Sequence, residues 1–245
     1  MSPSASVGST AAIVPGMDFA GHDGRTPELM PRSAADDAHV ANHEASHCLS
    51  GLVLFGVDSL GGSTIVASET AGGSTWGKRH SAELGSTEDD VSSDLCDQLR
   101  AVMPADFEPK SDASEIYAHC FCRVTDLLAG SAGEKLLCAD APWLAKSDLT
   151  QAERIASIVC TSAEAIELFL GFCRAEAENL VAKHRVSIQA VAAALIRHRT
   201  MTGDQIVAVV ADSVAREAMI AEQKRRIDWK RTEASARAFL AAAQP

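Results

Sequence analysis

Two histidines and a glutamate early in the chain have the spacing of a metal-binding helix. The stretch from His43 to His47 reads H-E-A-S-H, which fits the pattern H-E-x-x-H. Residues four apart on an α-helix lie one turn above each other on the same face, so both imidazoles can reach a single metal ion. Glu44 then lies beside that ion, where it can act as general base toward a water molecule. The motif therefore predicts a catalytic zinc (Zn2+) site.

The residues alone leave the third ligand of such a site open. A catalytic zinc takes three protein ligands and keeps a fourth position for water. Glu134 is a candidate for a buried carboxylate near the metal helix, although an exposed or structural role fits its position equally well. Asp148 follows Ser147, which can cap a new helix, and by itself it has the pattern of an ordinary acidic residue in a first helical turn.

The helix that carries the motif has recognisable start and stop signals. Ser33 and Asp36 have the spacing of a capping box, and Gly56 follows the last apolar residue of the segment. The sequence therefore predicts a helix that begins after Ser33 and runs through both histidines to about Phe55. Its second half is apolar nearly all round, so we expect this helix to be central and buried.

A short strand and a turn are expected after the helix. Residues 61–68 read as a strand, and Gly72 with Gly73 reads as a turn, which together predict a small sheet or hairpin. Such a strand can hold an extended peptide as an additional strand, or it can be purely structural. The stretch 72–79 nearly matches a phosphate-binding loop, but Arg79 replaces the required hydroxyl residue and no clear apolar helix follows, so we do not expect nucleotide binding.

The rest of the chain is expected to be helical. Apolar spacing and breaking residues predict helices over 88–103, from about Asp112 to Leu136, over 161–183 with a capping box at Thr161, over 186–196, and over 205–241 with a capping box at Thr202. The fold class predicted is mainly α: a helical bundle around the zinc helix with a small sheet or hairpin. We expect a flexible segment at 1–32, a metallopeptidase-like domain at 33–220 and a helical extension at 221–245.

Composition limits the classes of partner and compartment. The net charge of -11 argues against nucleic acid as the main partner and gives no sign of membrane attachment. No apolar run is long enough to span a bilayer, so a soluble protein is expected. The seven cysteines have no regular spacing and fit buried thiols in the reducing cytoplasm, Cys120 and Cys122 included. The basic cluster 224–231 is interpreted as a solvated face, with docking of an acidic partner as the alternative.

The order of these motifs resembles the peptidase domain of FtsH-type AAA metalloproteases. The resemblance covers roughly residues 36–212 and rests on the H-E-A-x-H helix, the strand and glycine turn, L-L-A-G-x-A-x-E at 127–134 and S-D-L-x-x-A-x-x-I-A at 147–156. It implies that Asp148 is the third zinc ligand, that Glu44 is the general base, and that Ile65 and Val66 belong to a strand that binds substrate. Ser46 departs from the family, which usually has glycine before the second histidine.

The resemblance implies a zinc metalloendopeptidase that hydrolyses peptide bonds of unfolded or flexible polypeptides. This chain carries no ATPase module, so we expect cleavage without ATP and a monomer or small oligomer rather than a ring. The alternative is a zinc-binding, peptidase-like adaptor that works beside a separate ATPase or another protein partner without cleaving. A zinc hydrolase with a different substrate is a weaker alternative, because a motif does not determine the substrate.

Overall fold

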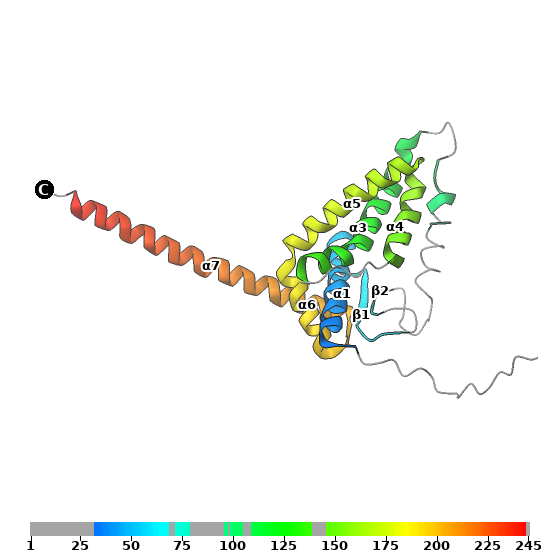
Figure 1. Ribbon diagram of the computed structural model, residues 1–245. Coiled ribbons are helices and arrows are strands. Elements are labelled where there is room, and N and C mark those ends of the chain that lie inside the picture. Colours follow the sequence, from blue (N-terminus) through cyan, green and yellow to red (C-terminus); the bar gives the residue numbers. More distant parts are fainter. Residues whose placement is uncertain are drawn as a thin grey trace, which may run out of the picture. The chain divides into compact units, whose positions relative to one another are not determined.

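The computed structural model describes residues 32–68, 72–78, 96–97, 99–104, 109–138 and 146–243. The predicted flexible segment at 1–32 lies almost wholly outside these residues, as does most of the helix predicted at 88–103. The described part is mainly helical and contains a small antiparallel sheet, which confirms the coarse fold class (Figure 1).

The motif helix α1 spans Ala34–Phe55 and is central, as predicted. Ser33 caps it in a capping box with Asp36, and Gly56 ends it with a φ of 86°, a conformation that glycine adopts without a steric penalty. Helix α1 contacts α3, α5 and α6 and both β1 and β2 (Figure 1). The helix that carries the site is thus held on several sides by elements from the rest of the fold.

The sheet has three strands in the order β2-β1-β3. Strands β1 (Leu60–Thr64) and β2 (Ser74–Gly77) form the predicted hairpin, although β1 is shorter than the sequence suggested. Strand β3 (Thr200–Thr202) was not predicted; it is three residues long and pairs with the other side of β1 across a large separation in sequence. Strand β1 is therefore the central strand of the described sheet, and β2 and β3 are its edge strands.

Besides α1 and helical residues at 96–97 and 99–101, the described part of the chain contains five longer helices. They are α3 (Ser114–Leu137), which follows the short 3-10 turn η1 (Lys110–Ala113), α4 (Lys146–Val159), α5 (Ala163–Lys183), α6 (Arg185–His198) and α7 (Gly203–Ala242). The predicted capping box of α7 at Thr202 and Gln205 is confirmed. The box predicted at Thr161 is wrong, because Ser162 caps α5 one residue later. Ser147 lies within the first turn of α4 instead of capping it.

The core lies where these helices meet α1. Its largest fully buried side chains come from α1, the residue after β1 and five other helices, and include Leu49, Ile65, Val124, Ile155, Val181, Ile188, Leu195 and Ile206. Alanines contribute to the buried face of α1, where Ala41 and Ala45 have no exposed surface. Small side chains let the helix axes approach closely, which accounts for an alanine-rich composition with few aromatic residues.

Helix α7 is continuous across residue 220, where the sequence placed a boundary between a domain and an extension. Side chains from Gln223 to Ala243 are exposed, including those of Ile227, Trp229 and Phe239.

Among the described helices, none alone has both the length and the apolarity to cross a membrane. Helices α4 and α5 meet that criterion only as a pair, which is bent by 119°.

Candidate metal centre

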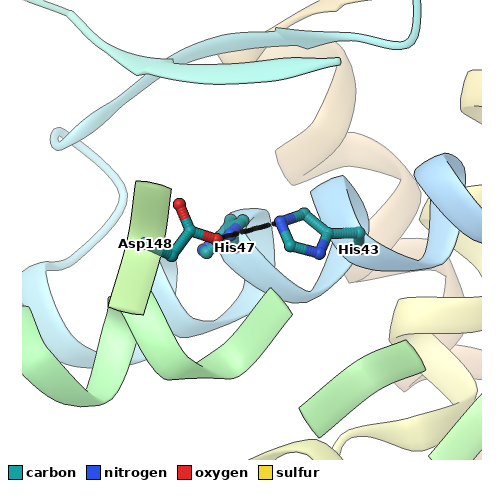
Figure 2. A group of neighbouring side chains, drawn as sticks. All are labelled: His43, His47 and Asp148. Carbon is teal, nitrogen blue, oxygen red and sulfur yellow. Dashed lines mark hydrogen bonds and ion pairs between the residues drawn. The ribbon is translucent and has the colours of Figure 1, made fainter. Parts of the chain in front are cut away.

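Three side chains predicted as metal ligands converge in the structure. His43 and His47 extend from one face of α1, and Asp148 reaches them from the first turn of α4 (Figure 2). The Nε2 atoms of the two histidines are 3.0 Å apart. Oδ2 of Asp148 lies 3.2 Å from Nε2 of His43 and 3.5 Å from Nε2 of His47. The sequence could place the histidines together by spacing, whereas only the fold brings Asp148 to them.

The other ring nitrogen of each histidine has a partner that determines where its proton resides. Nδ1 of His43 lies 2.6 Å from Oε1 of Glu134, and Nδ1 of His47 lies 2.9 Å from the backbone carbonyl of Asp126. Carboxylate and carbonyl oxygens only accept hydrogen bonds, so both Nδ1 atoms donate. In the neutral rings, both Nε2 atoms then present lone pairs to the centre of the cluster. The structure thus confirms Glu134 as a buried carboxylate beside α1, the helix that carries both histidines.

The centre of this cluster requires positive charge. Two imidazole lone pairs and a carboxylate oxygen face one another within hydrogen-bond distance, and Oδ2 of Asp148 is buried without a hydrogen-bond partner among the described residues. Burial acts to lower the pKa of His43, but the nearby carboxylates of Asp148 and Glu134 outweigh it and raise that pKa to about 10. Burial acts to raise the pKa of Asp148, but both histidines hold it well below its usual range. A proton or a metal ion can supply the charge.

The distances fit a metal ion. Zinc in tetrahedral coordination binds nitrogen and oxygen at about 2.0–2.1 Å, which places neighbouring ligand atoms about 3.3 Å apart. The three measured separations, 3.0, 3.2 and 3.5 Å, bracket that value. These three residues can therefore hold one metal ion, and three is the number of protein ligands that catalytic zinc sites use.

Glu44 lies next to the cluster and faces the sheet. Its side chain is nearly buried, and Oε2 accepts a hydrogen bond of 2.7 Å from the hydroxyl of Thr75 in β2. Burial raises the pKa of Glu44, while the two histidines and the Thr75 hydrogen bond act against this change. Burial also raises the pKa of the neighbouring Cys48 thiol to about 12, so this thiol is protonated at neutral pH. Thr75 was not predicted as a site residue, because its contact with Glu44 depends on the sheet.

Two glycines of α3 let this helix pack directly against α1 at the candidate metal ligands. A Cβ atom at Gly130 would lie 2.5 Å from Cε1 of His43 and from Nε2 of His47. A Cβ atom at Gly133 would lie 1.9 Å from Oγ of Ser46, the residue at which the chain departs from the resembling family. Ser46 is fully buried and donates a hydrogen bond of 2.7 Å to the carbonyl of Asn42. Its hydroxyl therefore occupies space that Gly133 leaves free.

The structure does not bring Ile65 and Val66 to this cluster as members of an edge strand. Both residues follow the last residue of β1, which is the central strand of the described sheet. Ile65 is fully buried and Val66 is exposed, and the Ile65 N–H donates to the carbonyl of Arg199. The strand that contacts Glu44 is β2. Substrate binding by Ile65 and Val66 stays a prediction.

Comparisons with known proteins add no family assignment. No family model matches this chain, and no curated protein matches it significantly. The candidate metal centre is therefore argued from the geometry of His43, His47 and Asp148, the hydrogen bonds that orient them and the adjacent Glu44.

Proposed function

We propose that the protein is a zinc metalloendopeptidase with an FtsH-peptidase-like fold, which hydrolyses peptide bonds of unfolded polypeptides without ATP. The observation that carries this proposal is the convergence of His43, His47 and Asp148 at metal-ligand distances beside the nearly buried carboxylate of Glu44. Two histidines, one carboxylate and a neighbouring glutamate are the set that hydrolytic zinc sites use.

The proposed reaction assigns three roles to the residues of the site: holding the metal ion, transferring a proton and orienting the two histidines. A zinc ion held by His43, His47 and Asp148 would supply a Lewis acid that polarises the substrate carbonyl and lowers the pKa of water. Glu44 accepts a proton from the attacking water and later gives it to the leaving amine. Glu134 and the Asp126 carbonyl keep each Nδ1 protonated, so that the Nε2 lone pairs stay directed at the metal.

Metal removal tests the proposal directly. The full-length protein, loaded with zinc, is expected to cleave unfolded casein, to lose this cleavage in 1,10-phenanthroline, and to regain it when zinc is restored. The measurement is the rate at which casein fragments appear on a gel, with a variant unable to bind metal as control. Cleavage at an unchanged rate after the metal has been removed would contradict a zinc-dependent reaction.

A second candidate function is a zinc-binding adaptor without proteolytic activity, working beside a separate ATPase or another protein. The exposed part of α7 favours it, because the large apolar side chains of Ile227, Trp229 and Phe239 are exposed there. The intact Glu44 favours the peptidase, since a scaffold has no use for a base beside the metal. A wild-type protein that binds zinc but never cleaves casein would favour the adaptor.

A further inference from the structure

We propose that Thr75 is a positioning residue that holds the carboxylate of Glu44 for proton transfer. The proposal rests on the proposed function, because it assigns a role within the same reaction. Thr75 lies in β2, an edge strand of the described sheet, and its hydroxyl contacts Glu44 of α1, 31 positions earlier in the chain. The contact is therefore created by the packing of the sheet against α1.

The hydrogen bond between Thr75 and Glu44 has a defined direction. An ionised carboxylate only accepts hydrogen bonds, so Thr75 donates its single hydroxyl proton to Oε2 over 2.7 Å. Oγ of Ser63 lies 3.0 Å from Oγ1 of Thr75, and Sγ of Cys48 lies 3.8 Å from that same Oγ1. Thr75 has one hydroxyl proton, and the carboxylate oxygen at 2.7 Å is a nearer and stronger acceptor for it than Oγ of Ser63 at 3.0 Å or the Glu44 carbonyl at 3.4 Å. Ser63 is fully buried in β1 and is the cross-strand partner of Thr75.

The two carboxylate oxygens of Glu44 have different surroundings. Oε2 is bonded to Thr75, whereas no hydrogen bond from a described residue reaches Oε1. A Cβ atom at Gly73 would lie 2.7 Å from Oε1 and would displace the carboxylate, so the glycine that precedes β2 keeps the space at this oxygen open. We infer that Oε1 takes the proton from water while Oε2 stays bonded to Thr75.

The orientation of the Glu44 carboxylate should affect the rate of the chemical step more strongly than it affects substrate binding. A general base must lie within hydrogen-bond reach of the proton that it removes, so free rotation of Glu44 would reduce the fraction of productive complexes. The Thr75 hydrogen bond should contribute strongly to the orientation of Glu44. Its acceptor is a charged carboxylate, and that carboxylate is nearly buried. Loss of the hydroxyl should therefore lower kcat and leave both KM and zinc binding nearly unchanged.

The test compares Thr75→Val, which keeps the shape of the side chain, with Thr75→Ser, which keeps the hydroxyl. Thr200→Val is the matched control, because it removes an exposed hydroxyl from β3 of the same sheet. Each full-length variant is loaded with zinc and analysed for metal content, thermal unfolding, and kcat and KM on labelled unfolded casein. Crystal structures of the wild type and Thr75→Val locate the Glu44 carboxylate independently of activity.

For Thr75→Val we expect kcat to fall about 10- to 100-fold, with zinc content unchanged and KM within about threefold. Thr75→Ser should recover most of the wild-type kcat, Thr200→Val should match the wild type, and the Glu44 carboxylate should be displaced in the Thr75→Val crystal structure. An unchanged kcat in Thr75→Val, beside an active wild type, would overturn the proposal. So would joint loss of zinc and activity in both Thr75 variants. An inactive wild type would refute the peptidase itself, and an unmoved Glu44 in Thr75→Val would then refute the positioning role.

Discussion

Replacement of Glu44 by glutamine is expected to leave zinc bound and to reduce casein cleavage by about 10²- to 10⁴-fold, the usual contribution of a general base. Glutamine has nearly the same shape, and its amide oxygen can still accept the hydrogen bond from Thr75. It cannot take a proton from water at neutral pH. The two functions of the site should therefore separate: metal is retained while turnover is lost.

The measurement for Glu44→Gln is the initial rate of casein cleavage together with the zinc content of the same preparation. Glu167→Gln is the matched control, because Glu167 is an exposed glutamate on α5. Equal rates for Glu44→Gln and the wild type would remove Glu44 from the reaction. Loss of zinc in Glu44→Gln would instead assign Glu44 to the metal ligands, against the geometry described above.

Replacement of Gly130 by alanine is expected to remove most of the bound zinc. The added Cβ atom would lie 2.5 Å from ring atoms of both histidines, a separation at which a side chain or a helix must move. Helix propensity acts in the opposite direction, since alanine favours a helix over glycine by about 1 kcal/mol. A fall in zinc affinity therefore reports the collision with the ligands and not a weaker helix α3.

Gly171→Ala is the control for this substitution. Gly171 lies in helix α5, and a Cβ atom there would have no neighbour within 4 Å. The measurement is zinc content after dialysis against a weak chelator, beside the midpoint of thermal unfolding. Gly171→Ala should keep its zinc and be at least as stable as the wild type. Full zinc retention by Gly130→Ala would contradict the packing of α3 against the ligands.

Local sequence signals predicted the parts of the site that lie within one element. The spacing of His43 and His47 requires only an α-helix, and the caps at Ser33 and Thr202 are formed by residues three apart. Asp148 looked like an ordinary acid at a helix start, and only the resemblance suggested it as a ligand. The structure brings it to the histidines because α4 packs beside α3 and presents its first turn to α1.

The parts that the sequence did not reveal depend on contacts between distant segments. Strand β3 has only three residues, so its alternation is too short to recognise, and Thr75 is adjacent to Glu44 only when β2 packs against α1. The prediction for Ile65 and Val66 assumed an edge strand, but the unrecognised β3 makes β1 central. Ser46 and Gly133 also could not be paired from the sequence. The side chain of Ser46 fits in the core because Gly133 of α3 has no side chain at that point.

The central claim is that His43, His47 and Asp148 together hold one metal ion. The most direct test is the metal content of the purified full-length protein and of Asp148→Ala, measured by mass spectrometry after dialysis. We expect about one zinc per chain in the wild type and a large loss in Asp148→Ala, because two ligands of three would remain. A wild type without bound metal, or an Asp148→Ala variant that keeps a full equivalent of zinc, would contradict this claim.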